Sequence, residues 1–146
     1  MRTFFNTFTK GLLPLLVAVL ISSVTLLSCD KGDLEIQHDF PFEVKVMPVP
    51  AAIANGNTVE IRLTIQPAGN YTGTQYFIRY FQFDGQGILR YYSEPPYHPN
   101  DLYRLPADEF RLYYTSTSAV SQSFEVWISD SSGNERQLSF EFNSSD

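Results

Sequence analysis

Side chains able to do covalent or acid–base chemistry are scarce in this sequence of 146 residues. It contains one cysteine, Cys29, and two histidines, His38 and His98. Catalysis by a serine or cysteine nucleophile needs a base and an orienting acid beside it, and no Gly-x-Ser-x-Gly sequence marks a nucleophilic serine. His98 would have to serve as the base alone. We therefore expect no catalytic residues and no enzyme activity.

The acidic side chains fit structural roles better than metal or acid–base chemistry. Asp108 and Glu109 are adjacent, so on a strand they point to opposite faces. Asp130, Asn134 and Glu135 offer oxygen ligands for calcium, but this span lacks the alternating acids of a calcium loop and suits a hairpin turn. The chain also lacks a phosphate-binding loop and histidine-rich metal spacing. We expect neither metal nor cofactor.

Cys29 lies at the end of an apolar leader. Arg2 and Lys10 are followed by an uncharged run over residues 12–27, and Ser28 then precedes the cysteine. This order of basic, apolar and small residues is typical of a secretory signal, and a helix of that run would span only about 24 Å of a hydrocarbon layer of about 30 Å. The end of the run resembles the lipobox of bacterial lipoproteins. We expect residues 1–28 to be a signal peptide and Cys29 to carry the lipid; an ordinary signal peptide or anchor is the alternative.

Residues 29–39 then form a polar, acidic tether between the lipid and the rest of the chain. Ten flexible residues reach about 17–19 Å, so we expect a domain over residues 40–146 close to the bilayer. Acyl chains would hold it to the membrane without a protein span. We expect a lipid-anchored protein of the bacterial cell envelope. The residues leave the choice of membrane open, with the outer membrane as the favoured expectation.

Composition describes one acidic, aromatic-rich domain. Acidic residues outnumber basic ones by 16 to 10, and two of the basic residues precede Cys29. Direct nucleic-acid binding is not expected, because a basic surface supplies most of that affinity. Hydrophobic residues make up 43% of the chain and charged residues 18%, which excludes a disordered tail.

Apolar residues after the tether recur with a period of two, which indicates strands. The clearest alternation lies over residues 58–65, and residues 84–87 and 130–134 are predicted as hairpin connections. The predicted strands cover residues 42–46, 58–65, 75–83, 88–92, 102–105, 109–115, 124–128 and 138–142. About seven short strands with Gly, Pro and Asn between them predict an all-β, immunoglobulin-like antiparallel sandwich. A closed barrel is the alternative.

More aromatic side chains are present than one thin core needs. Both faces of the strand over residues 75–83 are apolar, and Trp127 alternates with inward residues of its own strand. If these strands pair, Trp127 and Phe81 or Phe77 form an outward aromatic patch, a common mark of protein contacts. The alternative is a loop that folds over them.

A second candidate partner surface surrounds the proline-rich loop over residues 93–101. Prolines lower the entropy lost on ordering, and tyrosines add contact area with few rotors. The same composition suits a rigid cover over the open end of the sandwich. The candidate residues are Tyr91, Tyr92, Tyr97, His98, Tyr103 and Arg104.

Several blocks together resemble the TraQ conjugal transfer family, which comprises small lipoproteins encoded on conjugative transposons of Bacteroides and relatives. The blocks are HDFPFEVKVMPVP, NGNTVEIRLTI, GNYTGTQYFIRYFQFDGQGILR and PNDLYRLPADEFRLYYTSTSAVSQSFEVWISDSSGNE. The resemblance implies a lipidated Cys29 and a one-domain sandwich in the cell envelope. It further implies an accessory or assembly role in a conjugative DNA-transfer apparatus, through contacts with other apparatus proteins. A small glycan-binding lipoprotein is the alternative, and an inhibitor or chaperone of a larger complex would use the same surfaces.

Overall fold

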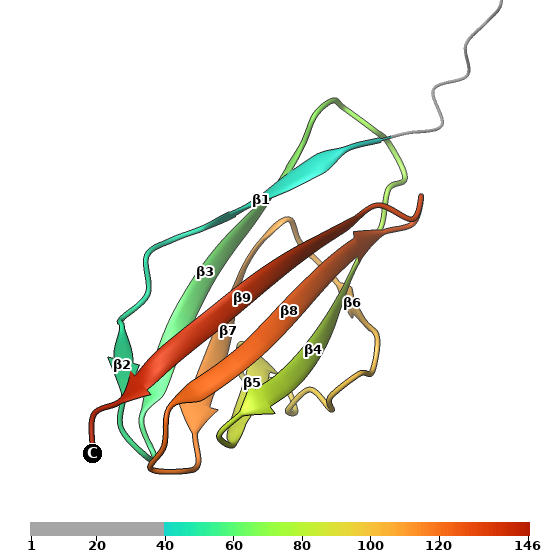
Figure 1. Cartoon of the computed structure of the whole chain (residues 1–146). Coiled ribbons are helices and arrows are strands. Elements are labelled where there is room, and N and C mark those ends of the chain that lie inside the picture. The colour runs from blue at the N-terminus through green and yellow to red at the C-terminus, as the bar shows by residue number, and fades with distance from the viewer. Residues whose placement is uncertain (1–39) are drawn as a thin grey trace, which may run out of the picture. The chain divides into compact units, whose positions relative to one another are not determined.

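A computed structural model describes residues 40–146, so the expected signal peptide, Cys29 and the tether lie outside the described residues. Within residues 40–146, no helix is long and apolar enough to cross a membrane. The described residues form nine strands (Figure 1). They are β1 (Phe42–Val46), β2 (Ala52–Ile53), β3 (Thr58–Pro67), β4 (Tyr76–Asp84), β5 (Gly87–Tyr91), β6 (Tyr103–Leu105), β7 (Glu109–Ser116), β8 (Gln122–Asp130) and β9 (Glu135–Ser144).

The strands form a β-sandwich. One sheet has four strands in the order β1-β3-β7-β5, and the other has five in the order β2-β9-β8-β4-β6. If β1, β3, β4, β5, β7, β8 and β9 are read as strands A to G, the sheets contain A-B-E-D and G-F-C. This is the arrangement of a constant-type immunoglobulin domain, so the predicted sandwich is confirmed.

Two short strands, β2 and β6, accompany the seven longer strands of the sandwich. The predicted strand over residues 102–105 corresponds to β6, whereas β2 was not predicted, because two residues are too few to show a period. β2 pairs with β9 in parallel, the single exception to antiparallel pairing among the described strands.

The predicted hairpin at residues 84–87 is wrong. β4 and β5 lie in different sheets, so this connection crosses the sandwich. The local turn signals resemble those of a hairpin, but β4 pairs with β8 in one sheet, whereas β5 pairs with β7 in the other. The crossing needs glycine. A Cβ on Gly85, whose φ is +71°, would lie 2.4 Å from Gln122, and one on Gly87 would lie 2.2 Å from the Tyr114 hydroxyl.

The core lies between the sheets and follows the period of two. On β3, Val59, Ile61, Leu63 and Ile65 point inward, as predicted, and are buried. Aromatic rings from both sheets stack at the centre: Phe124 lies 4.2 Å from Tyr114 between ring centroids. Burial of one such large apolar side chain contributes about 1.5–3 kcal/mol.

The β8–β9 connection is a hairpin, as predicted, and Asp130 organises it. Its Oδ1 accepts hydrogen bonds from the backbone N–H groups of Ser132, at 2.8 Å, and Asn134, at 2.9 Å. Its Oδ2 accepts from the Asn134 side-chain amide at 2.8 Å. Both carboxylate oxygens of this buried side chain therefore serve the turn.

Candidate functional site

The loop between β5 and β6 forms a cavity of about 450 Å³, here called the tyrosine–proline pocket. Five of the six candidate residues predicted around this loop line it. Its lining residues are Tyr91, Glu94, Pro95, Pro96, Tyr97, His98, Tyr103, Arg104 and Pro106. The volume falls within the range of about 300–1,000 Å³ common for ligand pockets.

Backbone hydrogen bonds hold the loop against both sheets. The Tyr97 N–H donates to the Leu89 carbonyl at 2.8 Å, and the Asn100 N–H donates to the Tyr80 carbonyl at 2.8 Å. Because Leu89 belongs to β5 and Tyr80 to β4, the loop bridges the two sheets on the side where β5 and β6 are the edge strands. The segment has the geometry of a rigid cover.

Tyr97 is the anchor of this cover. Its ring is buried and stacks on Tyr103 with 4.4 Å between centroids. Burial raises the pKa of the Tyr97 phenol, so the side chain stays neutral at physiological pH. The Tyr103 hydroxyl accepts a hydrogen bond from the His98 N–H at 2.9 Å. Tyr97 thus belongs to the core, whereas His98 and Arg104 are exposed at the pocket.

Tyr92 does not line the pocket, although its ring packs edge-on against Tyr91 with 4.9 Å between centroids. Its φ of +47° turns the chain at the end of β5, and its ring faces Tyr113 with 6.4 Å between centroids. Tyr113 is on β7 in the four-stranded sheet. The structure therefore does not place Tyr92 in the tyrosine–proline pocket.

The outward side of the five-stranded sheet carries the second candidate surface, here called the outer aromatic face: Phe77, Arg79, Phe81 and Trp127. β4 and β8 pair, as the aromatic patch requires. The register sets Trp127 opposite Arg79, and sets Phe81 opposite Glu125. The four side chains are half-buried, so they are neither covered completely nor fully in solvent.

Glu125 is held within the outer aromatic face by two donors. The Trp127 indole N–H donates to one carboxylate oxygen at 2.9 Å, and the Gln137 amide donates to the other at 2.6 Å. The indole edge is thereby fixed on the sheet, and both Glu125 oxygens have partners.

Two arginines link the two candidate surfaces. Arg104 lines the tyrosine–proline pocket and pairs across the β4–β6 ladder with Phe77, which places it beside the outer aromatic face. Arg79 lies two residues further along β4. Neither makes an ion pair with any residue in the part of the chain that the structure describes. The Arg79 Nε is buried and has no hydrogen-bond acceptor there.

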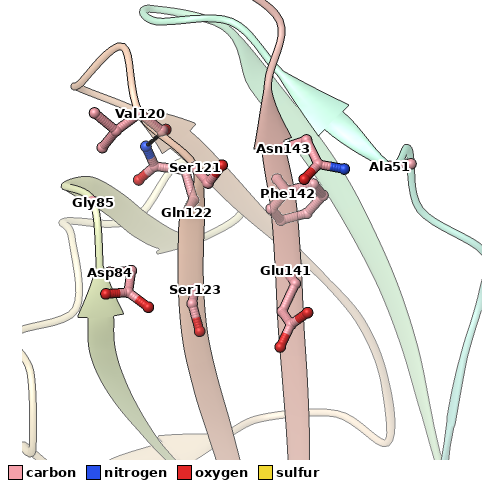
Figure 2. A pocket seen from close by; sticks show the side chains of 10 residues that line it. All are labelled: Ala51, Asp84, Gly85, Val120, Ser121, Gln122, Ser123, Glu141, Phe142 and Asn143. Atoms are coloured by element: carbon pink, nitrogen blue, oxygen red, sulfur yellow. Dashed lines mark hydrogen bonds between the residues drawn. The ribbon is translucent and has the colours of Figure 1, made fainter.

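Sequence reasoning missed a larger cavity of about 660 Å³ at one end of the sandwich (Figure 2). Asp84, Ser123 and Glu141 occupy matched positions on three neighbouring strands beside it. Gln122, which precedes Ser123 on β8, is buried, and its Oε1 accepts a hydrogen bond from the Tyr114 hydroxyl at 2.8 Å. The inward period of β8 includes Gln122, but no local pattern shows that three strand ends meet here.

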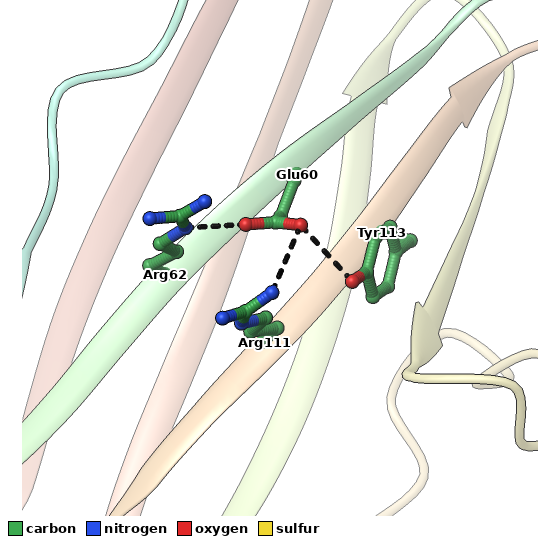
Figure 3. A network of polar contacts seen from close by, with 4 residues as sticks. All are labelled: Glu60, Arg62, Arg111 and Tyr113. Carbon is green, nitrogen blue, oxygen red and sulfur yellow. Dashed lines mark hydrogen bonds and ion pairs between the residues drawn. The ribbon is translucent and has the colours of Figure 1, made fainter.

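The outward side of the four-stranded sheet has a different character. Glu60 accepts hydrogen bonds from Arg62 and from the Tyr113 hydroxyl, and Arg111 lies 3.4 Å away (Figure 3). The hydrogen bond from Arg62 is the main cause of a Glu60 pKa below its ordinary value of 4.5. Arg62 and Arg111 on this face therefore share one carboxylate partner.

Residues 40–146 contain no group of three His, Cys, Asp or Glu side chains placed to hold a metal ion. Asp108 and Glu109 are exposed. The fold and these surfaces define a small immunoglobulin-like β-sandwich protein with aromatic and arginine-bearing outer surfaces.

The chain belongs to the TraQ conjugal transfer protein family, whose profile matches residues 12–145. This is a family of conjugal transfer proteins rather than an enzyme family, and it connects the chain with conjugation. No curated protein sequence matches the chain.

Solved structures from three Bacteroides species are similar to the chain. A conjugative transposon lipoprotein from Bacteroides eggerthii is 43% identical with a TM-score of 0.68, covering 73% of this chain and 100% of that chain. A lipoprotein from Bacteroides thetaiotaomicron is 45% identical with a TM-score of 0.67, covering 79% and 88%. A conjugate transposon protein from Bacteroides vulgatus is 47% identical with a TM-score of 0.65, covering 77% and 91%.

Proposed function

We propose that this protein is a non-enzymatic, lipid-anchored accessory or assembly factor of a conjugative DNA-transfer apparatus, and that it acts by contacting other apparatus proteins in the cell envelope. Membership of a conjugal transfer family supports the process. The description of similar Bacteroides proteins as lipoproteins supports an anchor at Cys29, with residues 1–28 as signal peptide and 29–39 as tether.

One observation carries the proposed mode of action. The outer aromatic face and the tyrosine–proline pocket adjoin on one side of the sandwich, and they combine half-buried aromatic rings with arginines that have no ion pair in residues 40–146. Aromatic residues and arginine are the side chains most enriched at energetically important protein contacts. Protein binding explains this combination better than catalysis does, since no nucleophile and base meet there.

The test is conjugation itself. We expect deletion of the gene from a donor strain to lower the frequency of transfer, and expression of the wild-type chain to restore it. Trp127→Ala should restore transfer poorly, because it removes the largest ring of the outer aromatic face. Met47→Ala is the matched control, since Met47 is an exposed apolar residue that follows β1 and lies outside both surfaces and the larger cavity. Normal transfer from the deletion strain would refute the proposal.

Affinity capture of the tagged wild-type chain from mating-competent cells identifies the contacts. Recovery of transfer-apparatus subunits with the wild type and their loss with Trp127→Ala are the expected results. An unchanged set of captured proteins, together with binding to a glycan array, would favour a glycan-binding lipoprotein instead. Separation of the two membranes on a density gradient assigns the anchor to the outer or inner membrane.

A further inference from the structure

The distribution of positive charge over the domain indicates what kind of partner its contact surface can bind. Residues 40–146 contain twelve acidic and seven basic side chains. Three of the basic side chains form ion pairs with acidic ones: Arg62, Arg111 and Arg136. Of the remaining four, Arg79 and Arg104 lie on adjoining strands on the same outward side of the five-stranded sheet. Two arginines without a counter-ion therefore lie close together where the outer aromatic face meets the tyrosine–proline pocket, whereas Lys45 and Arg90 lie on the two edge strands of the other sheet.

The neighbouring acids do not neutralise these arginines. Glu125 on the same face already accepts hydrogen bonds from Trp127 and Gln137. Glu94 also lines the pocket, but it forms no ion pair with Arg104. The buried Arg79 Nε also has no acceptor within residues 40–146, so no internal hydrogen bond takes up this guanidinium nitrogen.

We propose that Arg79, Arg104 and the tyrosine–proline pocket together bind an extended acidic peptide segment of another transfer-apparatus protein. A carboxylate of the segment pairs with the guanidinium groups, and an adjacent proline or aromatic side chain enters the pocket. The proposal rests on the proposed function and names the chemistry of the partner at that surface.

Several features favour a peptide over other anions. Guanidinium groups bind carboxylates in a bidentate manner, and grooves lined by aromatic residues and proline accept extended, proline-containing segments. β6 is an edge strand, so a segment can approach Arg104 without displacing another strand. Nucleic acid and anionic bilayers need a larger basic surface, and the domain carries an excess of acidic side chains.

The test uses the complete mature chain in detergent and a displayed library of random twelve-residue peptides. We expect selected peptides to combine Asp or Glu with Pro or an aromatic residue. Arg104→Gln and Arg79→Gln should each weaken binding of a selected peptide about tenfold, the usual effect of losing a hydrogen bond to a charged group. Arg90→Gln is the matched control, because Arg90 is exposed, has no ion pair in residues 40–146 and lies on the other sheet.

Charge reversal gives a second, independent readout. Arg104 is exposed, so Arg104→Glu should fold normally, and the library should then yield basic in place of acidic peptides. Failure to select acidic peptides on the wild type, or selection unaffected by Arg104→Glu, would overturn the proposal. So would binding of an acidic oligosaccharide, tested with oligogalacturonate, that is lost in Arg104→Gln while no peptide binds.

The two proposals fail separately. If gene deletion lowers transfer but Arg79→Gln and Arg104→Gln support normal transfer and no peptide is selected, the peptide site is wrong and the conjugation role stands. If peptides bind through the arginines but gene deletion leaves transfer unchanged, the binding chemistry stands and the conjugation role is wrong.

Discussion

Gly87→Ala tests how the chain crosses between the sheets. Gly87 begins β5, and a Cβ there would lie 2.2 Å from the Tyr114 hydroxyl oxygen and 2.3 Å from the ring carbon that bears it. Tyr114 cannot move aside easily. Its ring is fully buried and stacked on Phe124, and its hydroxyl donates to Gln122. The added methyl group must therefore displace either the strand or a core ring.

The change in unfolding free energy expected for Gly87→Ala follows from two opposing effects. Overpacking of a tight core costs about 1–3 kcal/mol, and a contact this short against a fixed ring belongs at the upper end. Replacing glycine also removes conformational freedom from the unfolded chain, which stabilises by about 0.4–1 kcal/mol. The φ of Gly87 is not in the left-handed region, so backbone strain adds nothing. The expected net loss of unfolding free energy is about 2 kcal/mol.

Urea unfolding followed by tryptophan fluorescence measures this loss. Denaturant slopes of about 1–3 kcal/mol per molar predict that the midpoint falls by about 1 M with an unchanged slope. Gly133→Ala is the control. Its φ is +93° and its Cβ position is free of neighbours, so only backbone strain of about 1–2 kcal/mol applies. Tyr114→Phe should cost less in the Gly87→Ala background than in the wild type, since it removes the closest contact. Additive effects of Gly87→Ala and Tyr114→Phe would refute the predicted clash.

Three further predictions concern the anchor, a charge network and a turn. Once the leader is removed, Cys29→Ala should shift the protein from the membrane to the soluble fraction; retention in the membrane would contradict lipidation. Glu60→Gln should destabilise the domain above pH 4.5, because the folded-state pKa of Glu60 is lowered mainly by its hydrogen bond from Arg62. The difference in stability between Glu60→Gln and the wild type, measured by thermal unfolding at a series of pH values, should disappear as the pH falls through the lowered pKa of Glu60. Asp130→Ala should cost about 2–3 kcal/mol in urea unfolding, since the donors of Asn134 lose their acceptor, and EDTA should leave the wild-type midpoint unchanged.

The long strands could be predicted because burial on one side imposes a period of two on the sequence. Residues 58–65 show it cleanly, and β3 forms there with the predicted inward face. No local sequence pattern of this kind indicates to which of the two sheets a strand belongs. Residues 84–87 have hairpin composition, yet β4 pairs with β8 and β5 pairs with β7, so the chain crosses the sandwich instead. That outcome depends on partners distant in the sequence.

The same distinction applies to the candidate residues: those joined by one loop could be grouped from the sequence, whereas placements that depend on backbone turns or strand pairing could not. Tyr91, Tyr97, His98, Tyr103 and Arg104 could be grouped because one short loop joins their strands, and they line one pocket. Composition could not separate Tyr92 from this group, since the positive φ at Tyr92 turns its ring toward Tyr113 on the outward side of the four-stranded sheet. The register that sets Trp127 opposite Arg79 needs the β4–β8 pairing as well as the alternation of each strand.

The two outward faces of the sandwich offer an internal comparison that bears on function. Both contain arginines beside aromatic rings, so composition alone does not distinguish them. On the four-stranded sheet, Glu60 binds Arg62, Arg111 and Tyr113, so both arginines already have a carboxylate partner and gain less from a further anion. On the five-stranded sheet, the nearest carboxylate is committed to Trp127 and Gln137, and the arginines have no counter-ion in residues 40–146. Binding of an acidic segment should therefore be confined to one side of the domain, and the affinity lost by neutralising Arg104 should not be lost by neutralising Arg111.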